Sequence, residues 1–186
     1  MYDIKDDFWI VRKGQMGRSG GILGIDTGVV TGWAYLDAAD GQLLEAGKLD
    51  LHGVERPYAW MHDQVFTLLR SRKPSKIVME QDFTSGNAFM TSTGHIRGAI
   101  KTAIEQLKLD YEEMNPMTAR AEIGSGGLKD PELRKLVCDW FKLPERVQLG
   151  GKGPWRVIPA DIIDAAAVAY ARFSKDKAAK AVLGGA

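Results

Sequence analysis

The order of apolar segments predicts an α/β protein, built on one mixed sheet with helices on its faces. Three strand-like segments come first, and helix-like segments then alternate with shorter strand-like runs. Strands that precede and alternate with helices pack most naturally in this way. The 186 residues are enough for one domain with a sizeable core.

The first three strands are expected at residues 22–25, 31–36 and 43–51. Residues 22–25 form a short apolar run, typical of a buried central strand, and Asp26 closes it. Asp40-Gly41 lies between the second and third segments and predicts a hairpin turn. These three strands are therefore expected to form an antiparallel meander.

The rest of the chain alternates helical periodicity with short apolar runs. A first helix is expected before Pro74, and residues 77–79 predict a buried strand that ends at Glu80. Residues 109–114 predict a fifth strand, and a last helix is expected to begin near Pro159. A second helix carries the apolar stripe Ile96, Ala99, Ile100, Ala103, Ile104 and Leu107. Asp130-Pro131 predicts the start of another helix, with Asp as the N-cap and Pro at the first helical position.

Composition suggests an ordinary globular protein without membrane contact. The chain is 45% hydrophobic and 26% charged, and no apolar run approaches the roughly 18 residues needed to span a bilayer. Its single Cys138 predicts a reducing, cytoplasmic setting, in a cell's nucleoid or in the host of a virus. Residues 1–20 are expected to be a flexible arm, 21–173 the folded domain and 174–186 a fraying tail.

Four acidic residues stand in largely apolar segments. Asp26 and Glu80 each close a strand, and Asp161 and Asp164 lie three apart on one face of the last helix. Converging carboxylates repel one another unless a cation lies among them. Hard divalent cations such as Mg²⁺ prefer oxygen ligands, and two ions about 4 Å apart can clamp a phosphoryl displacement. The hypothesis is a metal-dependent nuclease, although the net charge of +1 does not by itself suggest a nucleic-acid binder.

Five short motifs, between residues 21 and 172, resemble the RuvC family of Holliday junction resolvases. They read GIDTG from Gly24, EQDF from Glu80, GHIRGAI from Gly94, IGSGGLK from Ile123 and DIIDAAAVAYA from Asp161. Thr27 stands where that family usually has Pro, and the IGSGGLK loop is one residue shorter than the family's. The resemblance implies an RNase H-like fold with a mixed five-stranded sheet and helices on both faces.

The resemblance also implies the site and its partners. Asp26, Glu80, Asp161 and Asp164 become the catalytic acids, and they would hold two Mg²⁺ ions, for which Mn²⁺ can substitute. Metal-activated water would then attack the scissile phosphate of a four-way DNA junction. A homodimer would supply two active sites related by symmetry, with the second helix at the two-fold interface. The residues expected to contact DNA are Phe83, Arg97, Lys101, Arg120 and Lys129.

Other functions remain open at this point. The four acids alone do not separate a junction resolvase from an RNase H-like nuclease that acts on other branched DNA or on RNA. A branched-DNA-binding module without catalysis is a further alternative. Actin-like sugar kinases and ATPases also open with a strand, an Asp and a Gly-containing turn, but they need two such lobes and usually more residues.

Overall fold

A computed structural model describes residues 2–4, 8–14, 19–81, 89–148 and 155–183 of the chain. Seven strands form one sheet in the order β1-β2-β5-β4-β3-β6-β7. The pairs β3–β6 and β6–β7 are parallel, and the other neighbours are antiparallel. The strands are β1 (Tyr2–Ile4), β2 (Ile10–Arg12), β3 (Ile22–Asp26), β4 (Val30–Leu36), β5 (Leu43–Asp50), β6 (Lys76–Glu80) and β7 (Tyr111–Met114).

The mixed sheet expected from the sequence is confirmed, and its five expected strands correspond to β3 through β7. The expectation of a flexible arm over residues 1–20 is wrong for β1 and β2, which pair with each other and continue the sheet beyond β5. Phe8, Ile10 and Val11 are buried, so this apolar run covers a sheet edge that would otherwise be open.

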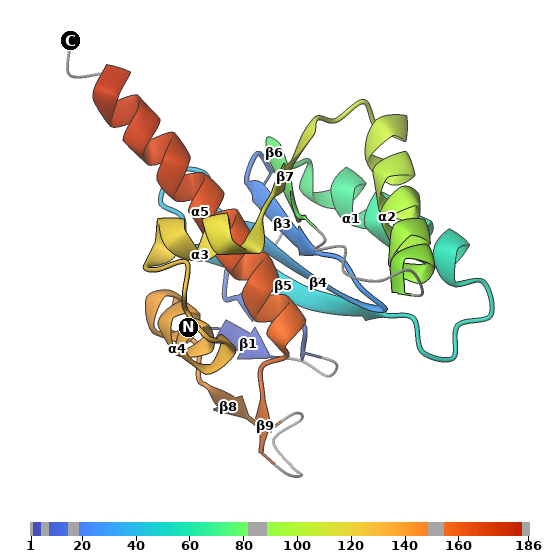
Figure 1. Ribbon diagram of the computed structural model, residues 1–186, viewed down its shortest axis with the longest axis horizontal. Coiled ribbons are helices and arrows are strands. Elements are labelled where there is room, and N and C mark those ends of the chain that lie inside the picture. The colour runs from blue at the N-terminus through green and yellow to red at the C-terminus, as the bar shows by residue number, and fades with distance from the viewer. Residues whose placement is uncertain (1, 5–7, 15–18, 82–88, 149–154, 184–186) are drawn as a thin grey trace.

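Helices cover both faces of the sheet (Figure 1). On one face lie α1 (Pro57–Arg72) and α2 (Phe89–Gln106), and the long α5 (Ala160–Leu183) crosses the other face. Successive side chains of β3 point to opposite faces of the sheet and so pack against both helical layers. Leu23 and Ile25 pack with α1 and α2, whereas Ile22 packs with α5. The helices α3 (Pro116–Ile123) and α4 (Asp130–Phe141) lie beside α5. Sequence periodicity did not predict α3.

The N-terminal half of α5 is almost entirely buried, whereas its later turns are more exposed. The expected tail over residues 174–186 is therefore helical as far as Leu183. Its Ala/Lys composition favours continued helix over fraying. No helix in the described part of the chain is long and apolar enough to cross a membrane.

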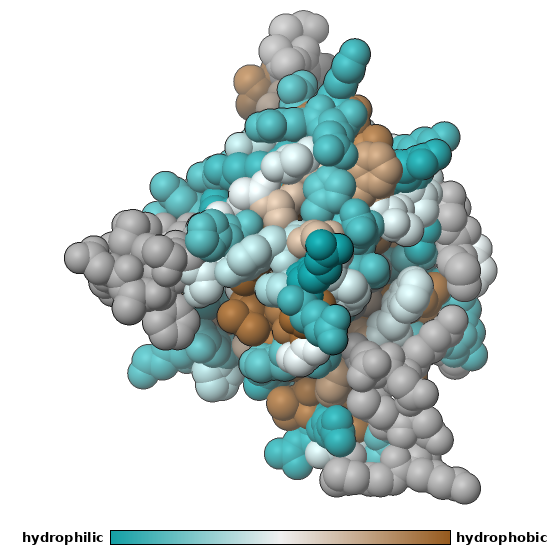
Figure 2. Space-filling view, turned by 90° about the vertical axis from the view of Figure 1, so that its right-hand side faces the viewer, coloured by the Kyte–Doolittle hydropathy of each residue, from teal (hydrophilic) through white to brown (hydrophobic). Residues whose placement is uncertain are grey.

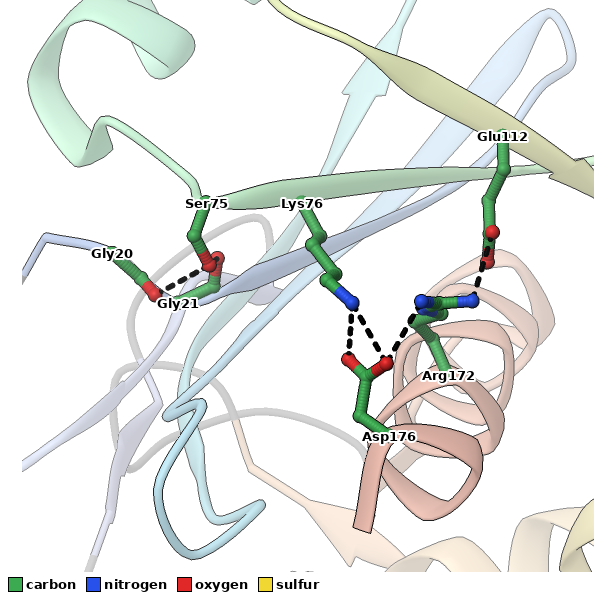
Figure 3. A network of polar contacts seen from close by, with 7 residues as sticks. All are labelled: Gly20, Gly21, Ser75, Lys76, Glu112, Arg172 and Asp176. Atoms are coloured by element: carbon green, nitrogen blue, oxygen red, sulfur yellow. Dashed lines mark hydrogen bonds and ion pairs between the residues drawn. The ribbon is translucent and has the colours of Figure 1, made fainter. Parts of the chain in front are cut away.

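A polar network fixes the middle of α5 to one end of the sheet (Figure 3). Lys76, the first residue of β6, donates to both carboxylate oxygens of Asp176 at 2.7 Å. Arg172 donates to Asp176 at 2.8 Å and to Glu112 of β7 at 3.0 Å. The network lies at the opposite end of β6 from Glu80, about 22 Å along the α5 axis from Asp161. Because the helix is held there, the direction in which its first turn points is also set.

The surface on the α1 and α2 side is mainly hydrophilic. Figure 2 shows this face, where teal atoms predominate and apolar atoms gather only in small separate patches. The apolar stripe of α2 is turned inward, since Ile96, Ile100, Ala103 and Ile104 are all buried. This stripe therefore belongs to the core of a single chain.

Candidate active site

Two of the predicted acids lie at the ends of neighbouring strands. In the parallel pairing of β3 with β6, Ile25 is opposite Met79, and each strand ends on the next residue, Asp26 and Glu80. Neighbouring strands are about 4.8 Å apart. Strand alternation puts both side chains on the α5 face of the sheet, the face to which Ile22 and Val78 also contribute.

The first turn of α5 passes over the same end of the sheet. Gly32 of β4 pairs with Asp26 across the ladder, and a Cβ on Gly32 would collide with the backbone carbonyl of Asp161. A Cβ on Gly24 would likewise collide with the carbonyl of Ala165. Two strand glycines therefore let the helix lie directly on the sheet, which brings Asp161 beside the strand that carries Asp26.

Asp164 lies one turn further along α5, and it is half-buried beside Arg120 of α3. Burial raises the pKa of this carboxyl, and the nearby Arg120 charge opposes the rise only partly. The guanidinium of Arg120 is 3.5 Å from Asp164, and it also donates to the carbonyl of Leu128 at 2.6 Å and to Asp130 at 2.9 Å. Arg120 thus ties the loop before α4 to the acid-bearing face of α5.

The donor set is suited to a hard divalent cation. The four acids offer only oxygen ligands, and the raised pKa of Asp164 indicates a carboxylate whose charge the protein alone does not fully compensate. Within the described residues no group of three or more His, Cys, Asp or Glu side chains is drawn together closely enough to hold an ion. The backbone therefore brings the acids to one end of the sheet without closing a complete cage, and Mg²⁺ does not require such a cage.

Comparison with known proteins agrees with this geometry. The chain is 29% identical over 140 residues to the crossover junction endodeoxyribonuclease RuvC of Acidobacterium capsulatum, covering 67% of this chain and 81% of that protein. No protein-family model matches.

Two solved structures show the same fold. The RuvC of Thermus thermophilus in complex with a Holliday junction substrate superposes with a TM-score of 0.70 at 18% identity, covering 86% of this chain and 96% of that one. The yeast mitochondrial Holliday junction resolvase Ydc2 superposes with a TM-score of 0.61 at 15% identity, covering 90% and 83%. The RNase H-like fold expected from the RuvC resemblance is confirmed.

Arg97, in the RuvC-like GHIRGAI motif, is buried beneath the site. Its side chain donates to the Thr27 hydroxyl at 3.1 Å and to the backbone carbonyl of Glu80 at 2.7 Å, and it lies 2.9 Å from Glu113 of β7. With 8% of its surface exposed, Arg97 joins the ends of β3 and β6 to β7. This placement corrects the prediction that Arg97 faces DNA phosphate, because its donors are directed into the protein.

The other RuvC-derived expectations have mixed outcomes. Lys101 forms an ion pair with Glu113 at 2.7 Å, and this hydrogen bond raises the lysine pKa. Lys129 is exposed immediately before α4, so a phosphate contact stays a prediction. Arg120 is mainly engaged with protein groups, and Phe83 lies outside the described residues.

Sequence reasoning missed the residues that position the acids. Glu113 anchors both Arg97 and Lys101, and nothing in its local pattern indicated that role. Gly24 and Gly32 carried a signal that was not used, because a glycine inside a strand often marks the close approach of another backbone. The hydroxyl of Thr27, which replaces the family's Pro, accepts a hydrogen bond that Pro lacks the group to accept.

Proposed function

We propose that this chain resolves four-way DNA junctions by paired, metal-dependent nicks. The observation that carries the proposal is that Asp26, Glu80 and the first turns of α5 meet at one end of the sheet, in a chain that is similar to RuvC. The related protein of Acidobacterium capsulatum is named a crossover junction endodeoxyribonuclease, and the Thermus thermophilus RuvC was solved with a Holliday junction substrate.

Asp26, Glu80, Asp161 and Asp164 would supply the oxygen ligands for two divalent ions, Mg²⁺ or Mn²⁺. Such ions, when bound, lower the pKa of a water nucleophile and stabilise the negative charge that develops on the phosphate. The protein contributes position: the β3–β6 pairing sets the spacing of the strand-borne acids, and the Arg97 hydrogen bonds hold that end of the sheet together. Arg120 orients the Asp164 carboxylate.

We also propose a homodimer, since two like strands of a junction call for two symmetry-related sites. The inward apolar stripe of α2 is already used within one chain, so a two-fold contact through α2 would involve its exposed side, around Gly98, Thr102 and Glu105. Sedimentation of the free and junction-bound protein tests this. A stable complex of one chain with one junction that still makes paired nicks would contradict the dimer.

The deciding experiment is cleavage of a substrate panel with a metal titration. The panel contains a synthetic four-way junction, a flap, linear duplex, single-stranded DNA and an RNA–DNA hybrid, each with Mg²⁺, Mn²⁺ or Ca²⁺. Symmetric paired nicks in the junction are expected, and Asp26→Asn should abolish them while junction binding persists. The matched control is Asp63→Asn, because Asp63 is an exposed acid on α1 whose side chain is 74% accessible.

Two results would overturn the proposal. Cutting of linear duplex at the same rate as the junction would indicate a nuclease of broader specificity. A protein that binds the junction but is inert with both Mg²⁺ and Mn²⁺ would be a non-catalytic branched-DNA-binding module.

A further inference from the structure

A small hairpin precedes the acid-bearing helix and stands outside the main sheet. β8 (Arg146–Val147) and β9 (Arg156–Val157) pair only with each other, in antiparallel register. Figure 1 shows them projecting from the end of the molecule where α5 begins. Because a two-stranded hairpin has little stability of its own, its attachment to the body decides how it is held.

One side of the hairpin is anchored in the core. Val147 is 7% exposed and belongs to the core cluster around α5, and Ile158, directly after β9, is completely buried. In an antiparallel pair, residues opposite each other share a face, and side chains alternate along each strand. Arg146 is opposite Val157, so these two lie on the face turned away from Val147.

The outward face is aromatic and basic. Trp155 is two residues before Val157, so alternation puts it on the same face. Trp155 is 64% exposed and Val157 is 43% exposed, and Arg146 is exposed on this same face. Arg156 is exposed as well, but it is opposite Val147 and belongs to the other face of the hairpin. Within the described part of the chain, neither arginine forms an ion pair and Trp155 has no ring partner; one acid, Glu145, precedes the hairpin. Tryptophan is enriched at interfaces, because its large apolar ring also carries a polar N–H group.

The hairpin lies within reach of the DNA segment at the candidate active site. Six residue steps separate Trp155 from Asp161, and an extended chain covers at most about 3.5 Å per step, which limits the distance between their Cα atoms to about 21 Å. One DNA strand advances about 3.4 Å per nucleotide, so that distance corresponds to about six nucleotides. The exposed ring therefore lies within about six nucleotides' length of any phosphate held at the acids.

We propose that the β8–β9 hairpin binds the DNA next to the cleavage site, with Trp155 stacking on an unpaired base and Arg146 and Arg156 contacting phosphates. This inference rests on the proposed function. Aromatic side chains stack on any base, since every base has a π-face, and arginine guanidinium groups match phosphate oxygens. The hairpin thus provides a sequence-tolerant contact that favours distorted or opened DNA over intact duplex.

The test measures junction affinity by fluorescence anisotropy in Ca²⁺, for wild type, Trp155→Ala, Trp155→Phe and the double variant Arg146→Ala/Arg156→Ala. Trp155→Ala should bind the junction about 5- to 150-fold more weakly than wild type, because it loses the stacking of one base. Trp155→Phe should keep most of the affinity, and the double-arginine variant should show a shallower salt dependence. Trp9→Ala is the matched control, because Trp9 is another exposed tryptophan, 45% accessible, that packs edge-to-face on Trp33. Its junction affinity should equal that of wild type.

A second readout separates stacking from a loss of structure. A 2-aminopurine base placed within six nucleotides of the cleaved phosphate should be quenched by wild type and not by Trp155→Ala, while the two proteins melt at the same temperature. Unchanged affinity and quenching in Trp155→Ala, with wild type still resolving junctions, would overturn the hairpin proposal alone. A Trp155→Ala protein whose oligomeric state changes while its DNA affinity stays at the wild-type value would also overturn the hairpin proposal. A wild-type protein that binds none of the DNA substrates would overturn both this inference and the proposed function.

Discussion

Replacement of Arg97 by alanine tests the packing beneath the candidate active site. The change removes hydrogen bonds to the Thr27 hydroxyl and the Glu80 carbonyl, together with the ion pair to Glu113. Thr27 follows Asp26 directly, and Glu80 is itself one of the acids. The variant should therefore be both less stable and less able to bind divalent metal.

The magnitude follows from the contacts. Hydrogen bonds from a charged donor contribute about 1.5–3 kcal/mol each, so two of them account for about 3–6 kcal/mol. The ion pair adds little, because Glu113 is 32% exposed and keeps Lys101 as a partner. Truncating one member of a buried pair typically costs about 3–5 kcal/mol, which agrees. For a chain of this size, that corresponds to a melting temperature lowered by about 6–20 °C.

The assay combines thermal melting with junction cleavage over a range of Mg²⁺ concentrations. Arg97→Ala should melt at the lower temperature and need more Mg²⁺ for half-maximal cleavage, whereas its affinity for the junction in Ca²⁺ should change little. The matched control is Lys101→Ala, because Lys101 lies on the same helix and pairs with the same Glu113 but is one-third exposed. Its stability loss should not exceed about 1 kcal/mol.

One result would refute this reasoning. Arg97→Ala could melt at the wild-type temperature and keep the wild-type Mg²⁺ dependence, yet lose affinity for the junction. Arg97 would then face DNA phosphate, and its burial in the free protein would not represent the DNA-bound protein.

Three further predictions follow from the same packing and charges. Gly32→Ala should abolish cleavage, because the new Cβ collides with the Asp161 backbone. Gly98→Ala, whose Cβ would meet no atom within 4 Å, should instead raise the stability of the folded chain by up to about 1 kcal/mol. A fully active Gly32→Ala would contradict the close packing. Burial raises the pKa of the Cys138 thiol to about 11, so thiol reagents at pH 8 should label native protein only as fast as it unfolds, and labelling at the rate of an exposed thiol would argue against this burial. The hydrogen bond from Lys101 is the largest cause lowering the pKa of Glu113, so wild type should be more stable than Glu113→Gln at any pH above the ordinary carboxyl pKa. Denaturation curves should show this stability difference fading as the pH falls through the lowered pKa of Glu113. A stability difference that does not change with pH would contradict this assignment.

Local sequence patterns predicted the strands and helices that depend mainly on the order of neighbouring residues. The apolar run ending at Asp26 and the one ending at Glu80 became the neighbouring strands β3 and β6. The helical period around Ile100 became α2, and α4 begins at Asp130, although its N-cap is Lys129 and not Asp130 as expected. Burial of one face makes apolar residues recur every 2 residues along a strand or every 3.6 residues along a helix, and this repeat can be recognised without knowing what packs against that face.

Arg97 shows where such reading fails. It follows Ile96 on α2, and the resemblance to RuvC implied that both Arg97 and Lys101 contact DNA. Its burial depends on Thr27, Glu80 and Glu113, which come from three different places in the chain and meet only through the parallel pairing of β3, β6 and β7. No pattern within α2 contains those partners.

The amino-acid order alone therefore determined the mixed α/β class, the acids at the strand ends and the buried final helix, since each reflects preferences of adjacent residues. Tertiary structure alone decided that residues 2–4 and 10–12 extend the sheet, that Gly32 admits the first turn of α5, and that the β8–β9 hairpin turns Trp155 outward. These outcomes depend on which distant surfaces meet and how closely, and contacts between residues far apart in the chain leave no period in the local sequence.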